Sequence, residues 1–569
     1  MQTKPLQNLP QDDRNWWKET IVYQIYPRSF QDSNGDGIGD LRGIINRLDY
    51  IASLGIETIW LNPIFQSPND DNGYDVSDYR AIMSEFGDMA DFDELLAELK
   101  KRKLRLLLDL VPNHSSDEHF WFRESRKSKD NPYRDYYYWK PGKADGEPPT
   151  NWVSYFAPST WEFDAVTGEY YLHLFSVKQP DLNWENPKVR EEIYEIMHFW
   201  LGKGIDGFRI DVLPFLSKRP DWPDMTPENF DGNLGKFYAN GPRLHEFLQE
   251  MNREVLSKYD CTSVGEGPGI SPEQAELYVG KNRHELHTIY HFEQMDLDRD
   301  PHNWVKPAKW SLVEFKKINN RWDVLADRGG WNTAFLGNHD FPRMVSRWGN
   351  DKNYRVQSSK LLLTYLLTQR ATPYIYFGDE IGMTNIDWMD LKKYNDLQVF
   401  DGHKKWLAAG GDEKEFLSYL PKTSRDNART PFQWNSSKNA GFSEAKPWLD
   451  INENYKFINA ESQENDPDSI LNYFRKMTRL RHNEPTLVYG NYLDWFPDHP
   501  NLYVYSRILG GEIFVVALNF SDHESEFEWK EEFKNQGSLV VSNYAGRLHE
   551  ITQTIRLNPW EAVVYKIEK

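Results

Sequence analysis

Carboxylates follow three short apolar segments that lie far apart in the chain. The segments are residues 204–210, 262–265 and 334–337. They lead into Asp211, into Glu266 and into the triplet Asn338-His339-Asp340. If the segments are strands of an α/β barrel, their carboxyl ends face one common site. Two carboxyl groups that flank a scissile bond are what hydrolysis of a glycosidic bond needs, so this pattern predicts an acid-base site of that kind.

The elements that must position these carboxylates can be followed along the chain. Short apolar segments alternate with longer amphipathic stretches, such as residues 91–101, 189–203 and 243–257. Such alternation favours a parallel sheet covered by helices. We therefore predict an α/β fold with a (β/α)8 TIM barrel. Its strand candidates are residues 22–26, 58–61, 104–111, 207–210, 263–265, 288–291, 334–337 and 374–377.

Two regions interrupt or follow this alternation. The stretch after the third strand candidate is rich in Tyr, Trp, Pro and Lys and predicts a small inserted domain. Beyond residue 496, segments 501–507, 512–519, 537–542 and 562–567 alternate like antiparallel strands and predict a C-terminal β-sandwich domain. The expected domains are the first part of the barrel (1–113), the inserted domain B (114–183), the second part of the barrel (184–495) and the C-terminal β domain (496–569).

The amino-acid composition indicates which class of ligand or partner the protein binds. The 569 residues hold 67 Lys and Arg against 87 Asp and Glu, a formal net charge of −20. This charge disfavours nucleic acid and anionic membranes and suits a small neutral ligand. The many aromatic rings could stack on sugar faces, although most of them must be core. The single cysteine, Cys261, excludes an intrachain disulfide.

No apolar run approaches the length of a membrane span. The first thirteen residues, Met1 to Asp13, are polar and have no apolar signal core. The chain as given therefore predicts a cytoplasmic protein, which we expect to be a monomer.

The loop of residues 32–40 reads Asp-Ser-Asn-Gly-Asp-Gly-Ile-Gly-Asp and places oxygen ligands at alternate positions. Hard oxygen ligands at this spacing suit Ca²⁺, and the glycines permit the tight turn. The twelfth position is Gly43 rather than Glu, so the loop is not an EF-hand. We predict a structural calcium site; the alternative is an acidic surface turn. The ligands would be Asp32, Asn34, Asp36, the Ile38 carbonyl and Asp40.

Several long motifs carry a family resemblance that covers the chain from about Trp16 to its C-terminus. They are residues 22–30 (VYQIYPRSF), 71–75 (DNGYD), 109–114 (DLVPNH), 179–184 (QPDLNW) and 424–431 (SRDNARTP). With them the chain resembles the α-amylase family of glycoside hydrolases. Within that family it is similar to the group of oligo-1,6-glucosidases, α-glucosidases and sucrose isomerases.

The resemblance implies roles for single residues. Asp211 would be the nucleophile, Glu266 the acid and base, and Asp340 the group that holds sugar hydroxyls and favours a distorted ring. Arg209 lies on the same side of its strand as Asp211 and would keep that carboxylate ionised. Further residues match the pocket for the non-reducing glucose: Asp71, Tyr74, His114, Phe175, Gln179, His339 and Arg425. The chemistry itself needs no cofactor.

The positions around the leaving group resemble the hydrolases in some places and the isomerases in others. In this group, Val at the position of Val212 is typical of enzymes that act on α-1,6 bonds, and Thr at this position is typical of enzymes that act on α-1,4 bonds. Gly267 and Pro268 resemble the hydrolases, since the isomerases carry an aromatic residue just after this glutamate. The segment Asp298-Arg299-Asp300 and residues 367–373 look closer to the isomerases. Gln398 stands where the 1,6-hydrolases usually have Glu, and Lys306 could still bind the second sugar.

Three hypotheses follow. The favoured one is a retaining, exo-acting α-glucosidase that releases glucose from the non-reducing end of short α-1,6-linked substrates such as isomaltose. The second is a sucrose isomerase or transglucosylase on the same fold, or an α-1,4-specific glucosidase. The third is a catalytically inactive barrel like the transporter-associated heavy chains. Intact Asp211, Glu266 and Asp340 disfavour it. The segment Leu213-Pro214-Phe215 is a further departure from the group that the sequence does not explain.

Overall fold

The computed structural model describes residues 14–231, 233–301, 303–530, 533, 536–547 and 553–567. Residues 1–13, which carry the polar N-terminus discussed above, lie outside this part. Within it, no helix is both long enough and apolar enough to cross a membrane.

An eight-stranded parallel sheet forms the centre of the molecule, as predicted. Its order is β11-β10-β9-β5-β2-β1-β15-β14, and a parallel bridge from Ile289 to Asn332 brings its two edges together into a barrel. The strand predicted at residues 334–337 is shorter and earlier, at Thr333–Ala334. The strands are β1 (Val22–Ile25), β2 (Thr58–Leu61), β5 (Arg105–Leu110), β9 (Gly207–Ile210), β10 (Thr262–Gly267), β11 (Thr288–His291), β14 (Thr333–Ala334) and β15 (Thr372–Tyr376).

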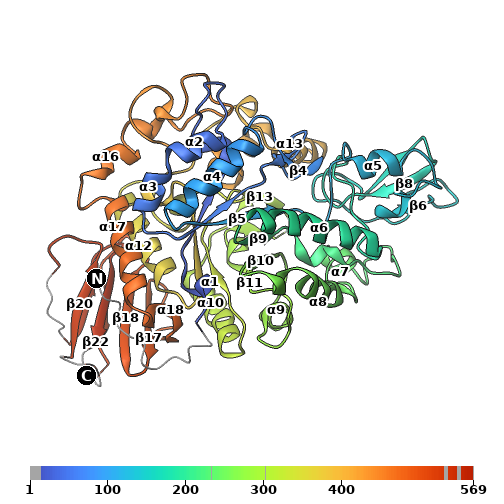
Figure 1. The fold of residues 1–569 in the computed structure, drawn as a ribbon. Coiled ribbons are helices and arrows are strands. Elements are labelled where there is room, and N and C mark those ends of the chain that lie inside the picture. The colour runs from blue at the N-terminus through green and yellow to red at the C-terminus, as the bar shows by residue number, and fades with distance from the viewer. Residues whose placement is uncertain are drawn as a thin grey trace.

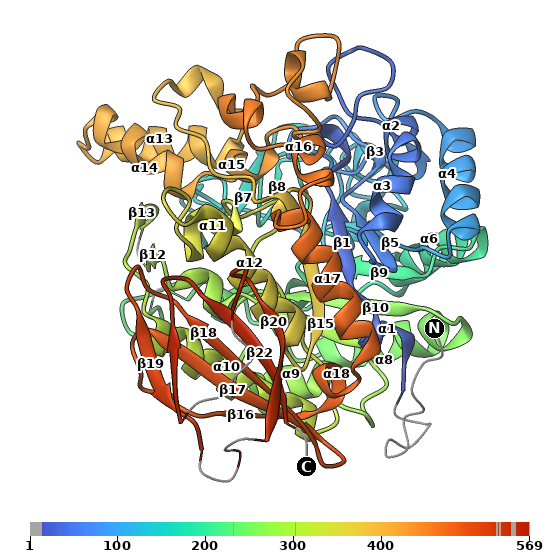
Figure 2. The same ribbon diagram turned by 90° about the vertical axis from the view of Figure 1, so that its left-hand side faces the viewer.

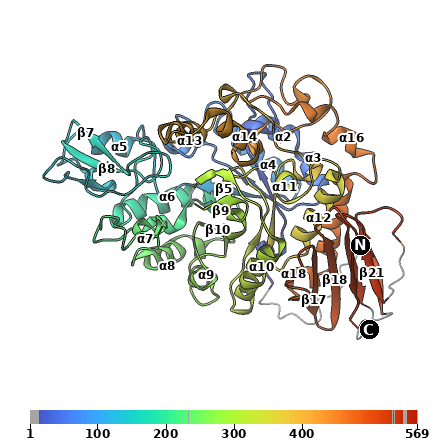
Figure 3. The same ribbon diagram turned by 180° about the vertical axis from the view of Figure 1, so that it is seen from behind.

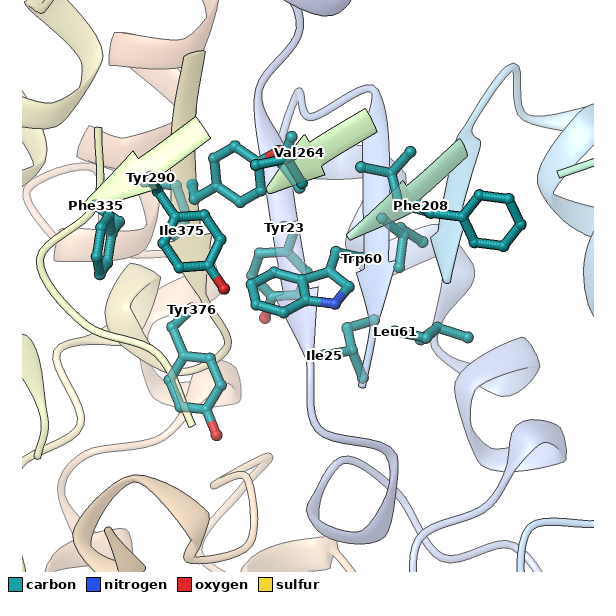
Figure 4. Close-up of a cluster of buried hydrophobic side chains, with 14 of the residues drawn as sticks. Tyr23, Ile25, Trp60, Leu61, Phe208, Val264, Tyr290, Phe335, Ile375 and Tyr376 are labelled. Atoms are coloured by element: carbon teal, nitrogen blue, oxygen red, sulfur yellow. The ribbon is translucent and has the colours of Figure 1, made fainter. Parts of the chain in front are cut away.

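Side chains fill the barrel. Every residue of β1 and β2 is buried, as expected for strands of a parallel sheet that is covered on both faces. Tyr23, Trp60, Tyr290 and Ile375 come from four different strands and lie close together (Figure 4). Gly207 begins β9 with φ 148°, and a Cβ there would lie 1.9 Å from the carbonyl oxygen of Thr262. Only glycine therefore lets β9 approach β10 so closely.

Helices with clear start and stop signals cover the barrel. A capping box of Asp88 and Asp91 begins α4, while Pro187 begins α6, which ends at Gly204 in the left-handed conformation. This stop lets the chain enter β9 and deliver Asp211. The longer helices are α4 (Met89–Lys101), α6 (Pro187–Lys203), α8 (Leu244–Glu254), α9 (Pro272–Val279), α10 (Leu312–Asp327), α12 (Arg355–Thr368) and α17 (Ile470–Asn483).

The segment after β5 forms the small projecting lobe in cyan at the right of Figure 1. It contains α5 (Phe120–Ser125) and an antiparallel sheet in the order β6-β8-β7, with strands Trp139–Lys140, Glu169–Leu172 and Trp161–Asp164. A buried ion pair between Lys218 and Asp181, at 2.7 Å, joins the end of this lobe to the segment that follows β9. The lobe is thereby attached directly to the segment that follows β9.

A second antiparallel sheet lies on the other side of the barrel, against α12 and α17 (Figures 1 and 2). Its order is β16-β17-β18-β22-β20, and a separate pair, β19 with β21, packs on it over a common apolar core. The sheet begins at Asn491, five residues before the expected domain boundary. The strands are β16 (Asn491–Asp494), β17 (Leu502–Leu509), β18 (Glu512–Asn519), β19 (Ser525–Glu528), β20 (Gly537–Ser542), β21 (Thr554–Leu557) and β22 (Ala562–Ile567).

A smaller unit lies between β15 and α17 and was not predicted. It consists of α13 (Leu397–Ala408) and α14 (Glu413–Thr423), which are labelled in the upper part of Figure 3. With β13 (Asn303–Pro307) these helices form a separate apolar cluster that includes Val305, Val399 and Phe416. The unit places the start of α13 beside the carboxyl ends of the barrel strands.

Candidate active site

A pocket of about 380 Å³ opens at the carboxyl ends of the barrel strands. Arg209 and His339 lie behind its wall, in contact with lining residues, and the other predicted catalytic and substrate-binding residues line it directly. These are Asp71, Tyr74, His114, Phe175, Gln179, Asp211, Val212, Glu266, Asp340 and Arg425. The structure therefore brings together carboxylates from β9, from β10 and from the segment after β14.

Arg209 connects the acidic groups at the bottom of the pocket. Its Nη1 donates to Asp211 and, at 2.8 Å, to Asp109, while Nη2 lies 2.9 Å from Glu266. Its Nε donates to the hydroxyl of Tyr290 at 2.7 Å. One planar guanidinium thus fixes the directions of both carboxyl groups that the chemistry requires.

The same surroundings raise the pKa of these two carboxyl groups by different amounts. Burial raises the pKa of Asp211 to about 6, against the opposing charge of Arg209. Burial raises the pKa of Glu266 further, to about 8, with nearby Asp211 and Asp340 adding to the effect. Near neutral pH, Asp211 is therefore mainly ionised and Glu266 mainly protonated. A nucleophile and a proton donor need these states.

Val212 makes an unusual turn directly after Asp211. Its φ is 35° and its ψ is 44°, a left-handed conformation that is rare for a β-branched residue. In this turn the Val212 N–H donates to Glu266 at 2.9 Å. Strain at this residue is therefore coupled to the position of the acid. The following residues form a short 3-10 helix, Leu213–Leu216, that contains Pro214.

His339 has a defined tautomer. Gln24 donates from Nε2 to Nδ1 of His339 at 2.9 Å, because an amide nitrogen has only donors to offer. The proton of His339 is therefore on Nε2, which lies 2.7 Å from the hydroxyl of Tyr74 and 3.1 Å from Asp340. Tyr74 in turn donates to Asp109 at 2.9 Å. This network orients Tyr74 and Asp340 toward the pocket.

Asp340 is held ionised. Burial on its own would raise its pKa, but nearby His339, Arg425 and Arg429 outweigh burial and lower it. Burial lowers the pKa of His339 to about 3, so the imidazole is neutral and the two arginines supply the lasting positive charge. Arg425 lies 3.4 Å from Asp340, and Arg429 lies 3.2 Å from it. An anion so stabilised can accept hydrogen bonds from sugar hydroxyls and favour a cationic ring.

The deep end of the pocket is closed by a second cluster. Arg425 lies 3.4 Å from Asp71, and Gln179 donates to the other oxygen of Asp71 at 3.3 Å. His114 lies 3.3 Å from Gln179 and packs on Phe175, with ring centroids 5.1 Å apart. Polar groups beside an aromatic face suit a sugar ring, whose hydroxyls and apolar face need both.

Several lining residues were not among the predicted site residues. Tyr155 and Phe156 come from the inserted lobe, where no periodic pattern marks them. Phe292 and Phe341 directly follow a strand end and a predicted carboxylate, so their positions could have indicated them. Arg299 lies over the ring of Phe341 at 4.7 Å. The sequence had placed Pro268, Arg299 and Gln398 near the leaving group without assigning them a role, and all three line the pocket. The remaining lining residues are Phe215, Gly269 and Asp296.

Supporting carboxylates were also missed. Asp109 lies next to the end of strand β5 and is bonded to Arg209 and to Tyr74. Asp396 is fully buried, caps the N-terminus of α13 and binds Arg425. Asp396 thus connects Arg425, at the closed end of the pocket, with the helix that carries Gln398. Lys306, by contrast, lies over the ring of Trp406 at 5.3 Å and does not line the pocket.

None of the five predicted calcium ligands lines the pocket. Their donor set of hard oxygens suits Ca²⁺, yet the buried carboxylates already accept backbone N–H groups. Asp32 accepts from Gly35 at 2.7 Å and from Gly37 at 2.8 Å, and Asp40 accepts from Ser33 at 2.9 Å. In the part of the chain that the structure describes, no three His, Cys, Asp or Glu side chains converge to hold a metal. The calcium site stays a prediction.

A closed parallel barrel with two buried carboxyl groups on one arginine, opposite a carboxylate for the sugar, defines a glycoside hydrolase. The chain belongs to the α-amylase family: the family pattern described as alpha amylase, catalytic domain, matches residues 24–490.

Relatives of known function are similar to almost the whole chain. The oligo-1,6-glucosidase of Parageobacillus thermoglucosidasius is 52% identical over 98% of this chain and 99% of its own. Among solved structures, the isomaltulose synthase from Klebsiella sp. LX3 is 47% identical, with a TM-score of 0.95, over 98% of this chain and all of its own. The trehalose-6-phosphate hydrolase of Bacillus licheniformis, solved as a mutant, is 44% identical with a TM-score of 0.94, over 98% and 100% of the two chains.

Proposed function

We propose that the protein is a retaining, exo-acting α-glucosidase that releases glucose from the non-reducing end of short α-glucosides, with α-1,6 linkages favoured. The observation that carries this proposal is the pair Asp211 and Glu266, which share Arg209 at the bottom of the pocket. Burial raises the pKa of both carboxyl groups, and that of Glu266 further. Neutral disaccharides and oligosaccharides are the substrate class. The similarity to oligo-1,6-glucosidases over nearly the whole chain supports the same conclusion.

The geometry supports a double displacement. Asp211 attacks the anomeric carbon while the bond to the leaving oxygen breaks and Glu266 donates its proton to that oxygen. A water molecule then attacks the opposite face of the glucosyl-enzyme, and Glu266 takes the proton of that water. The bond to Asp211 breaks, which restores both carboxyl groups to their starting states. Asp340 accepts hydrogen bonds from the ring hydroxyls as positive charge develops on the sugar.

Exo-action follows from the closed end of the pocket. Arg425 lies within 3.4 Å of both Asp71 and Asp340, so charged side chains stand where a further sugar would have to lie. A single terminal glucose would fill this end, with Phe175 and Tyr74 as its apolar surfaces. The leaving sugar would then face Val212, Gln398 and the aromatic side chains of Phe292 and Phe341.

A second candidate function rests on the residues that surround the leaving group. Arg299 and Phe292 line the leaving-group side of the pocket, and the isomaltulose synthase from Erwinia rhapontici, solved with sucrose, is 45% identical to this chain. Isomerisation of sucrose would need the released fructose to be retained and water to be excluded. We also propose that Ca²⁺ binds the loop of residues 32–40 and serves only stability.

The two candidates differ in their products. Purified protein should be supplied separately with isomaltose, maltose and sucrose, and the products resolved by chromatography. We expect glucose to be released fastest from isomaltose. Isomaltulose or trehalulose as the main product from sucrose would favour the isomerase. A clear preference for maltose would show that Val212 does not set the linkage, and Gln398 would be the next residue to vary.

A further inference from the structure

A second pocket, of about 250 Å³, lies between the helices of the barrel and the C-terminal sheet. Lys360 of α12 and Lys476 of α17 line it on the barrel side. On the other side it is lined by β20 and the residues that follow that strand, up to Arg547. Figure 2 shows α17 and β20 beside each other. No residue of this pocket lines the active-site pocket.

Lys360 is buried without enough acceptors. Its exposed fraction is 5%, and among the described residues its ammonium has one acceptor, the carbonyl of Asp468 at 2.6 Å. Lys316 provides the comparison inside the same molecule. It is also buried, and its ammonium donates to three carbonyls at 2.6, 2.8 and 3.0 Å. The ammonium of Lys360 also lies 5.5 Å from the ring centroid of Tyr473, another residue that lines the pocket. An ammonium has three N–H donors, so Lys360 keeps at least one for a ligand in the pocket.

The charges around Lys360 point to the sign of that ligand. Lys476 is exposed and has no ion pair within the described residues. Burial lowers the pKa of Lys360, and the charge of Lys476 adds to this effect, whereas Asp468 and Asp466 oppose it. Among the described residues, Arg547 binds Glu561 through Nη1 at 3.1 Å, and a guanidinium has five N–H groups in all. Asp468 is the one acidic residue among those that line the pocket. Three cations therefore meet in a chain whose formal net charge is −20.

We propose that this pocket binds the phosphate group of a small ligand, either inorganic phosphate or a sugar phosphate. Phosphate oxygens accept several charge-assisted hydrogen bonds at once, which two ammonium groups and a guanidinium can supply. Lys360 and Lys476 belong to helices of the barrel, and Arg547 belongs to the C-terminal domain. A phosphate held by all three joins the two parts and stabilises their packing by mass action.

Thermal unfolding and titration calorimetry of the full chain test this proposal. Inorganic phosphate and glucose 6-phosphate should each be compared with sodium chloride at equal ionic strength. We expect a saturable rise in the melting temperature that persists when glucose fills the active site. Tighter binding of glucose 6-phosphate would identify the ligand as a sugar phosphate. Equal binding would identify phosphate itself.

Variants separate this pocket from non-specific charge effects. Lys476→Ala should weaken phosphate binding by about tenfold, the expected loss for one charge-assisted hydrogen bond, with unchanged glucosidase activity. Lys360→Met should weaken it at least as much. Lys352→Ala, which removes a lysine whose side chain is 84% exposed, is the control and should bind phosphate normally. Because Lys476 is exposed, its variant gives an answer even if Lys360→Met does not fold.

Two results would overturn the proposal. The first is a melting temperature that responds to phosphate no differently from chloride. The second is phosphate binding by Lys476→Ala that equals binding by the Lys352→Ala control.

Discussion

Buried cations serve different purposes in two regions of this molecule. At the pocket, Arg209, Arg425 and Arg429 are bound to carboxylates. Between the barrel and the C-terminal sheet, Lys316 and Arg481 are bound to backbone carbonyls instead. Arg481 donates to the carbonyls of four residues: Leu367, Gln369, Ala371 and Leu487.

The difference between the partners has physical consequences. A carboxylate can gain or lose a proton, so a cation beside it changes its pKa and its reactivity. A backbone carbonyl does not titrate, so a cation beside it can only hold the chain in place. Burial without a carboxylate partner lowers the pKa of Arg481 to about 9. Burial acts in the same direction on Arg209, but nearby Asp109 and Glu266 outweigh it and raise the pKa of that guanidinium. The first region is therefore built for chemistry and the second for stability.

The largest effects on turnover should come from the pocket. Asp211→Asn and Glu266→Gln should each lower kcat/KM by about 10²–10⁴-fold or more, because neither amide can replace its acid. The melting temperature should change little, since each amide has nearly the shape of its acid. Circular dichroism and assays on isomaltose check both expectations. Turnover near the parent level in either variant would remove the assigned role.

The largest effect on stability should come from the other region. Lys316→Met would leave three carbonyls without their donor, one of them buried and two partly buried, and should lower the free energy of unfolding by about 1–3 kcal/mol. The folded fraction should keep its kcat. Lys317→Met, which changes the exposed neighbour on the same helix, is the matched control for denaturant unfolding. Equal stability of the two variants would contradict the structural role of these carbonyl bonds.

Linkage preference should respond to a smaller change in the pocket. Val212→Thr replaces a methyl with a hydroxyl beside Asp211. We expect the ratio of kcat/KM for isomaltose to kcat/KM for maltose to fall, by a factor that corresponds to about 1–3 kcal/mol of discrimination. The N–H bond from residue 212 to Glu266 is a backbone contact and should survive this substitution. An unchanged ratio would mean that the leaving sugar does not contact this side chain.

The pH dependence of kcat/KM tests the protonation states of Asp211 and Glu266. Below pH about 6 Asp211 becomes protonated and loses its nucleophilic form, and above pH about 8 Glu266 loses the proton that it must donate. The profile of kcat/KM should therefore be bell-shaped, with about a tenfold loss for each pH unit outside this window. Initial rates in buffers of constant ionic strength measure it. A rate that stays flat from pH 5 to 9, which extends about a unit beyond both values, would contradict this protonation scheme.

The smallest effect should come from the loop of residues 32–40. If Ca²⁺ binds there, chelator should lower the melting temperature by mass action without changing kcat. Asp36→Ala should remove this sensitivity, since Asp36 is a predicted ligand that is not needed for catalysis. No response to chelator, together with no calcium in the purified protein, would leave the loop as a turn held by its own N–H bonds.

Much of the fold could be predicted because its signals are local. Buried parallel strands are short apolar runs, and the ends of β9 and β10 are marked by Asp211 and Glu266. Strand β14 was placed too late because the apolar residues after Ala334 continue to be buried without pairing in the sheet. Burial and strand pairing give the same sequence signal there.

Other parts of the site depend on contacts that sequence spacing does not show. Asp396 reaches Arg425 across 29 positions, and Gln24 fixes the tautomer of His339 across 315. Tyr155 lines the pocket because a whole inserted lobe folds over it. The left-handed turn at Val212 contradicts the preference of a β-branched residue, so no local rule predicts it.

The stereochemistry of the first product tests the central claim most directly. Two displacements, by Asp211 and then by water, invert the anomeric carbon twice and retain its configuration. Proton NMR during the first moments of isomaltose hydrolysis, before mutarotation, distinguishes the two anomers of glucose. We predict α-glucose as the first product. Initial release of β-glucose would mean a single displacement and would contradict the role of Asp211 as nucleophile.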